Sequence, residues 1–126
     1  MVASIAVQTA LYDALTAALT CPVYDAVPVD AAMPYVVFAS HQVLDADYVT
    51  GSHERILFYL SVYSDYAGSI EVQGILGVIK ATLHQKRLAL ADGVMEGMAV
   101  TRSTASPDIA DDTFMGSCTI DVRVRP

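Results

Sequence analysis

Residues 54–63 have the sequence Glu-Arg-Ile-Leu-Phe-Tyr-Leu-Ser-Val-Tyr, and this stretch decides the fold. β-Branched and aromatic residues dominate it, and side chains of an extended chain point alternately to two faces. One face is continuously apolar, with Ile56, Phe58, Leu60 and Val62. The other face mixes polar and apolar groups, with Arg55, Leu57, Tyr59, Ser61 and Tyr63. The pattern predicts a strand that packs one face on a core.

The preceding run, Tyr35 to Leu44, is equally rich in β-branched and aromatic residues. Its alternate residues can share a face: Tyr35, Val37, Ala39 and Val43. Turn-forming residues fill the segment from Asp45 to Ser52 between the two runs. We therefore expect the two strands to pair antiparallel, with a loop at 45–52.

Two segments carry the spacing of amphipathic helices. In the first, from Ala3 to Leu19, the apolar stripe is Val7, Leu11, Leu15 and Leu19. Cys21-Pro22 ends it, and a short extended piece follows at Val23–Val27. In the second, Ser69 to Gln85, the stripe is Val72, Ile75, Leu76, Ile79 and Leu83. Gly74 and Gly77 lower its helix propensity, so we expect a neighbouring backbone to approach closely there.

The C-terminal part of the chain predicts two further strands. Met98–Ser103 is the first, Thr104–Thr113 a polar loop, and Gly116–Pro126 the second. The last strand alternates cleanly, with Cys118, Ile120, Val122 and Val124 on one face. This order of elements does not fit repeated βαβ units. We predict a single α+β domain over residues 1–126, an antiparallel sheet of about four to five strands with two helices packed on one face.

Composition narrows the possible functions. The chain has 126 residues, is 54% hydrophobic and 17% charged, and has a formal net charge of −7. Such a chain repels polyphosphate, so we expect no specific nucleic-acid binding. It contains no apolar run long enough for a membrane span, and its first residues lack a cationic region, so we expect no secretory leader. Cys21 and Cys118 lack metal-site spacing and are expected to be buried free thiols of a cytosolic protein.

Sequence motifs for catalysis are absent, and we assign no catalytic, cofactor-binding or metal-binding residue. His41 and His53 flank the predicted hairpin and could approach each other as a two-histidine metal site, or could be ordinary polar residues near a sheet end. His84 is expected to cap a helix or to be solvated. Neither the aspartates at 108, 111 and 112 nor the pair at 45 and 47 has the spacing or surroundings of a calcium or acid/base site.

Several stretches resemble the tail-completion, or tail-terminator, family of long-tailed, siphovirus-like phages and of gene transfer agents. They are the helix with Ala10-Leu-Tyr-Asp-Ala-Leu15, Val23-Tyr24 and Pro28, the segment Met33-Pro-Tyr-Val-Val37, the strand Ile56–Tyr63 before a helix, and an acidic segment with Phe114 before an alternating last strand. The resemblance implies a non-enzymatic virion protein at the head-proximal end of the tail, synthesised in the bacterial cytoplasm. It also implies a hexameric ring that caps the tail tube, stops its polymerisation and joins it to the head, with DNA passing through.

The partners so implied are sister subunits, the major tail tube protein and a head–tail connector or neck protein. From the strand faces we expect the subunit interface at Leu57, Tyr59 and Tyr63; the alternative is that a second helix covers this face. We expect two loops, Asp45 to Ser52 and Thr104 to Thr113, to contact the tube or the neck, although each loop could be a passive connection. The contacting residues we expect are Asp45, Asp47, Tyr48, Asp108, Asp111, Asp112 and Phe114. Two other functions remain open: a ligand- or metal-binding domain or enzyme using His41 and His53, and another neck protein of similar fold.

Overall fold

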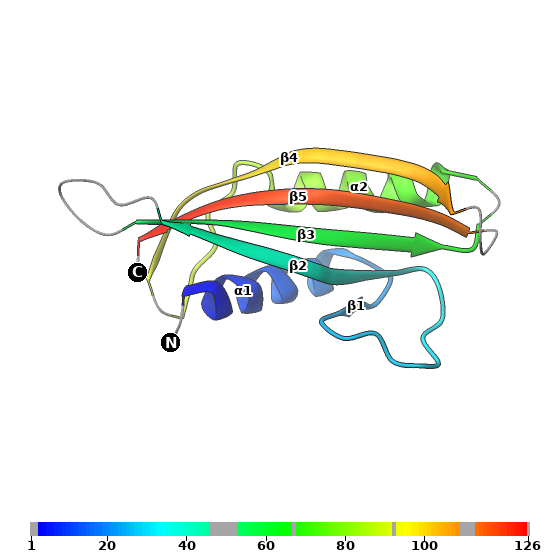
Figure 1. Ribbon diagram of the computed structural model, residues 1–126, viewed down its shortest axis with the longest axis horizontal. Coiled ribbons are helices and arrows are strands. Elements are labelled where there is room, and N and C mark those ends of the chain that lie inside the picture. Colours follow the sequence, from blue (N-terminus) through cyan, green and yellow to red (C-terminus); the bar gives the residue numbers. More distant parts are fainter. Residues whose placement is uncertain (1–2, 46–52, 67, 92, 109–112, 126) are drawn as a thin grey trace.

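The computed structural model describes residues 3–45, 53–66, 68–91, 93–108 and 113–125. The elements in chain order are α1 (Ala3–Ala18), β1 (Val23–Tyr24), β2 (Tyr35–Asp45), β3 (Glu54–Ser64), α2 (Ile70–Leu83), β4 (Val94–Asp108) and β5 (Thr113–Arg125). The strands form one sheet in the order β1-β2-β3-β5-β4, antiparallel except between β1 and β2. Both helices lie on the same face of the sheet (Figure 1). The predicted fold class is confirmed.

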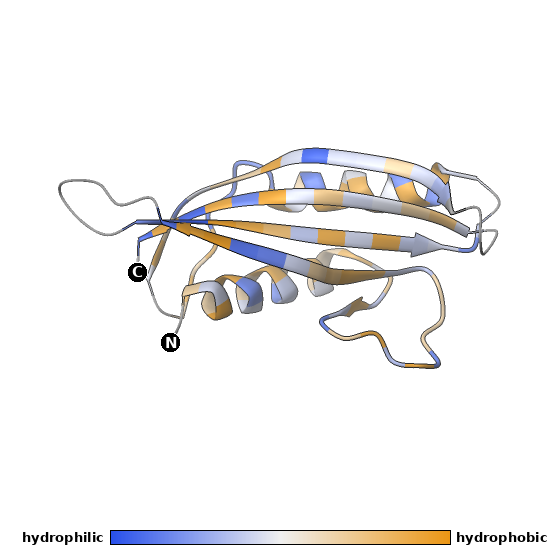
Figure 2. Cartoon of the chain, in the orientation of Figure 1, coloured by the Kyte–Doolittle hydropathy of each residue, from blue (hydrophilic) through white to orange (hydrophobic). Residues whose placement is uncertain are grey.

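Strand β3 lies at the centre of the sheet, between β2 and β5. Its four apolar residues on the helix side are fully or almost fully buried, as predicted: Ile56, Phe58, Leu60 and Val62. The alternation of hydrophobic and more hydrophilic positions along the strands is visible in Figure 2. Burying each such side chain stabilises the fold by roughly 1.5–3 kcal/mol.

The helices supply the other half of the core. α1 buries Val7, Leu11 and Leu15, and α2 buries Val72, Leu76, Ile79 and Leu83. These residues form one cluster with the inward side chains of β3 and with Cys118, Ile120, Val122 and Val124 of β5. The alternation of β5 and the helical stripes therefore agree with the sequence, except that Ile75 and Leu19 are only partly buried and Leu19 lies beyond the end of α1.

The turn from β3 into α2 is fixed by side-chain hydrogen bonds. The hydroxyl of the buried Ser64 donates to Oε1 of Glu71 at 2.6 Å and accepts the backbone N–H of Tyr66 at 3.1 Å. Glu71 lies in the first helical turn, where a carboxylate also suits the helix dipole. This network sets where the second helix begins.

A β-bulge in β2 changes which residues share a face. The register shifts between Phe38 and Ser40, so Tyr35 pairs with Tyr63 on one face and Val43 pairs with Ile56 on the other. The prediction that Tyr35, Val37, Ala39 and Val43 share a face is therefore wrong for Val43. A bulge inserts one unpaired residue, and every side chain beyond it changes face. The extended piece is also shorter than predicted, since β1 covers only Val23–Tyr24.

The predicted loop at Thr104–Thr113 is wrong at both of its ends. β4 continues to Asp108, which pairs with Thr113 of β5. Polar residues enter the strand because β5 supplies their backbone partners, and the hydroxyls of Thr104 and Ser117 lie 2.7 Å apart across the pair. The outer edge of β4 is an edge of the sheet, and its residues 101–107 are all exposed.

The glycines pack differently from the prediction. A Cβ atom at Gly74 or Gly77 would meet nothing within 4 Å, so no backbone approaches either residue closely in the described chain. The crowded glycine is Gly116 in β5, where a Cβ would lie 2.4 Å from Cγ1 of Val72 and 3.1 Å from Cδ1 of Leu76. Side chains of α2 thus pack tightly against the backbone of β5 at Gly116.

These environments predict opposite effects of one substitution. Gly116→Ala should lower the free energy of unfolding by about 1–3 kcal/mol, because the added methyl group overlaps Val72. Gly74→Ala should raise it by up to about 1 kcal/mol, because the helix gains propensity at an open position. Urea unfolding monitored by circular dichroism measures both. Equal effects of the two substitutions would contradict the packing described at Gly116.

Candidate functional site

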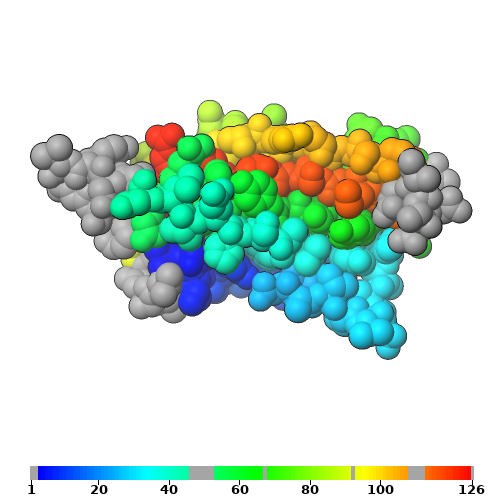
Figure 3. Space-filling view, in the orientation of Figure 1, coloured from blue at the N-terminus to red at the C-terminus, as the bar shows by residue number. Residues whose placement is uncertain are grey.

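The face of the sheet turned away from both helices is the candidate functional site, and we refer to it as the open face. The strand register puts Leu57, Tyr59 and Tyr63 on it, and all three side chains are half-buried among their neighbours in the sheet. Neither helix covers this face in the described part of the chain (Figures 1 and 3). The alternative that a second helix covers it is therefore wrong for the residues described.

Aromatic side chains form a row at one end of the open face. Tyr24 of β1, Tyr35 of β2 and Tyr63 of β3 follow one another across three adjacent strands. Their ring centroids are 5.8 Å apart for Tyr24–Tyr35 and 5.4 Å apart for Tyr35–Tyr63. Such pairs hold large side chains in place, so the row offers a rigid apolar area with polar hydroxyl tips.

An ion pair lies toward the other end of the same face, where β3 begins. Nε of Arg55 donates to Oδ1 and Oδ2 of Asp121 at 3.1 Å each, and its Nη2 donates to Oδ2 at 2.8 Å. The hydrogen bonds and charge of Asp121 raise the pKa of Arg55 above its ordinary value. Because Arg55 stays substantially exposed to solvent, the pair orients the two side chains more than it stabilises the fold.

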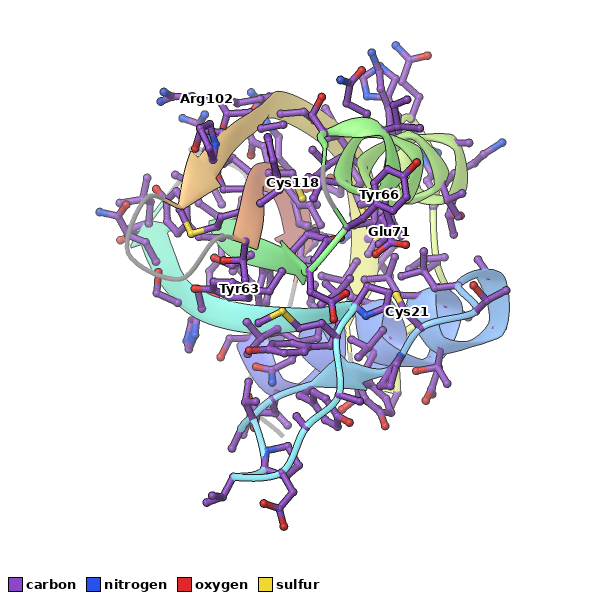
Figure 4. All side chains as sticks on the ribbon, turned by 90° about the vertical axis from the view of Figure 1, so that its right-hand side faces the viewer. Cys21, Tyr63, Tyr66, Glu71, Arg102 and Cys118 are labelled. Atoms are coloured by element: carbon purple, nitrogen blue, oxygen red, sulfur yellow. The ribbon has the colours of Figure 1, made fainter. Side chains whose placement is uncertain are left out.

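The open face is basic, although the chain is acidic overall. Opposite Arg55 stands Arg123, and the register adds Arg125 and the exposed Arg102 of β4. Arg102 points away from the helices in Figure 4. Among the described residues, Asp121 is the acidic residue that the register puts on this face, with Glu96 at the bulge of β4. A surface of this kind favours an acidic partner.

The two histidines of the alternative hypothesis do not come together. His41 pairs with Phe58 and stacks on its ring at 5.6 Å, whereas His53 precedes β3 and its Nδ1 lies 2.6 Å from Oε1 of Glu96. Five positions of β3 separate them, about 16 Å at the rise of an extended strand. The alternative in which His41 and His53 approach each other as a metal site is therefore wrong. Within the described ranges no three metal-ligating side chains gather in one place.

His84 has a structural role at the end of α2. It is the C-cap residue, and its Nδ1 accepts the backbone N–H of Val100 at 3.1 Å. The side chain thereby ties the helix to β4, which agrees with the expected capping position. Among the described residues, neither α1 nor α2 has the length and apolar character of a membrane span.

Comparison with known proteins identifies the family. The model of the family described as "Tail completion protein gp17" matches residues 5–125. The chain belongs to this family. Membership confirms the resemblance found in the sequence and makes the chain a structural protein of a phage-type tail.

Solved structures agree with this assignment. A chain from the "Virion of native gene transfer agent (GTA) particle" is similar at a TM-score of 0.86 and 28% identity, covering 98% of this chain and 97% of that one. A second solved structure matches at a TM-score of 0.58 and 17% identity over 98% of this chain and 94% of that one, which supports the fold alone. No curated protein sequence matches.

The predicted contact loops of this tail completion protein are only partly described. Asp45 is the exposed last residue of β2, while Asp47, Tyr48, Asp111 and Asp112 lie outside the described residues. The prediction that Asp108 and Phe114 are loop residues is wrong. Asp108 is the last residue of β4, and Phe114 lies half-buried in β5 opposite Ser64 and Pro107. They are strand residues because the β4–β5 pairing continues almost to the connection between the strands.

The cysteines do not form a reactive site. Both thiols are free, Cys118 buried in the core and Cys21 half-buried beside α2. Burial raises the pKa of Cys118 from 9.0 to about 12 and also raises that of Cys21. Since the thiolate is the nucleophile, Cys118 stays protonated and unreactive at neutral pH.

This burial predicts a loss of stability in alkali. The unfolded thiol ionises near pH 9, while the folded thiol stays protonated to about pH 12. The contribution of Cys118 to the free energy of unfolding is therefore complete below pH 9 and is lost as the pH rises between these two values. The free energy of unfolding should fall by up to about 1.4 kcal/mol per pH unit there. Urea unfolding measures this free energy at pH 8.5 and at pH 10. Between these two values it should fall less for Cys118→Ala than for the unmodified chain. Equal falls would contradict burial of the thiol.

Proposed function

We propose that this tail completion protein is a tail terminator. Copies of the chain form a closed ring, a hexamer by its resemblance to the family, which caps the tail tube, stops its polymerisation and joins it to the neck of the head. The ring acts by binding and not by catalysis. The observation that carries the proposal is the open face: a rigid apolar and basic surface that no helix covers in the described chain, on a member of a tail completion family.

Self-association explains why this face is left uncovered. Leu57, Tyr59 and Tyr63 give it apolar area, and tyrosine keeps a polar tip that tolerates water before assembly. A head-to-tail contact joins two different surfaces of identical subunits, and it closes into a ring when the rotation between neighbours permits. Closure limits the number of subunits, as a terminator requires.

The two strand connections suit a ring with two different sides. The β2–β3 connection leaves the sheet beside Val124, near the C-terminal end of β5, and the β4–β5 connection leaves it at the other end, beside Ser64. The first contains Asp47 and Tyr48, and the second contains Asp111 and Asp112. We propose that one side of the ring binds the tube and the other binds the neck protein.

Tube growth tests the function directly. Adding the purified chain to polymerising major tail tube protein should stop elongation, because a capped end no longer presents a surface for the next tube ring. Electron microscopy should show shorter tubes with extra density at one end. Tubes that grow equally long with and without the chain would refute the terminator function.

Tyr59→Asp tests the open face as a contact between subunits. A buried charge without a partner costs several kcal/mol, so the variant should fail to form rings while its monomer keeps the fold. Native mass spectrometry measures assembly, and circular dichroism measures folding. Ala89→Asp puts the same charge on an exposed connection and should assemble normally. If the Tyr59→Asp variant still assembles, Tyr59 does not lie in the interface. If the variant unfolds, Tyr59 belongs to the core.

A further inference from the structure

Acidic and basic residues are distributed unevenly along the chain, and the N-terminal part is purely acidic. No lysine or arginine precedes Arg55, whereas this part of the sequence contains Asp13, Asp25, Asp30, Asp45, Asp47 and Glu54. α1 and β1 come from this part, and β1 is one edge of the sheet. We define α1 and the segment through Pro34 as the acidic flank. Its aspartates Asp13, Asp25 and Asp30 are all exposed.

The acidic flank contains a groove between α1 and the residues after β1. Its helical wall is a stripe at positions i, i+3, i+4 and i+7: Ile5, Gln8, Thr9 and Tyr12. Asp25 forms the opposite wall, and the volume is about 320 Å³. Ile5 is 54% exposed and Tyr12 41% exposed, so this part of α1 offers apolar area that its own sheet does not cover.

The groove has the chemistry of a site for a guanidinium group. Nε2 of Gln8 donates to Oδ1 of Asp25 at 2.9 Å and so holds the carboxylate at the groove. A carboxylate binds a guanidinium through charge-assisted hydrogen bonds, an aromatic ring such as that of Tyr12 attracts it through its π face, and Ile5 can pack on the methylene groups. Arginine satisfies all three contacts better than lysine does.

The same chain supplies exposed arginines, but on the opposite side of the sheet. The register puts Arg102 and Arg123 on the open face. α1 packs on the other face of the sheet, away from Arg102 (Figure 4). The groove and these arginines therefore cannot meet within one subunit. Two copies can bring them together, because each copy has one surface of each sign.

We propose that the groove of the acidic flank on one copy receives an open-face arginine of the next copy, so that the acidic flank of one subunit covers the open face of its neighbour. The proposal rests on the proposed ring for its biological setting. The occupant is a second copy because charge, exposed apolar area and hydrogen-bonding groups of the two surfaces are complementary. The surfaces differ, so the contact is head-to-tail, as ring closure requires.

Charge reversal with exchange of partners tests the contact. The flank variant combines Asp13→Arg with Asp25→Arg, and the face variant combines Arg102→Asp with Arg123→Asp; all four residues are exposed in the monomer. Each variant alone opposes like charges at every contact and should self-associate at least about tenfold more weakly than the unmodified chain. An equimolar mixture restores opposite charges at every contact and should assemble into alternating rings of both variants, visible by native mass spectrometry.

Recovery in the mixture also shows that both variants are folded. The control variant, Lys86→Asp with Arg87→Asp, makes the same charge change on exposed residues beyond α2 and should assemble normally. The proposal is overturned if either variant alone assembles like the unmodified chain, if the mixture stays dissociated, or if the control also fails to assemble.

The result separates this contact from the proposed function. If the unmodified chain assembles and the mixture recovers, but tube growth continues in its presence, the subunit contact stands and the terminator function fails. If the flank and face variants both assemble and stop tube growth, the function stands and the contact lies elsewhere.

Discussion

Two helices bury one face of a five-stranded sheet, and in the described chain they leave the other face uncovered. The alternation of β3 requires helices on one face, because Ile56, Phe58 and Leu60 have to be shielded from water there. The other side then has to tolerate water in the free subunit, and in the proposed ring it also has to release that water where two subunits meet. Tyrosine, serine and paired arginine satisfy both conditions, and β3 presents all three there beside Leu57.

The sequence predicted the elements whose signal is local and periodic. The stripe from Val72 to Leu83 and the alternation from Cys118 to Val124 each repeat one residue class at the period of one structure, so both were found with their buried residues. The open face was also identified from β3 alone. Whether a helix covers it depends on tertiary packing, and the sequence left that alternative undecided.

Features that depend on pairing partners were not predictable from the same patterns. The bulge in β2 between Phe38 and Ser40 has no compositional signal, yet it moves Val43 to the other face. The second half of β4 looks like a loop until β5 supplies its hydrogen bonds, and Gly116 matters only because Val72 packs against it. The basic character of the open face was missed for a related reason: Arg55, Arg102 and Arg123 are distant in sequence and adjacent only through the strand register.

The long outer edge of β4 has a consequence for the supply of subunits. Exposed strand edges pair readily with other chains, and such pairing would remove free copies of this protein. Pro107 has no N–H to offer along this edge, and Arg102 keeps a charge beside it. Both features discourage strand addition by other polypeptide chains, so a cell that overproduces this chain should not lose it to fibrous deposits.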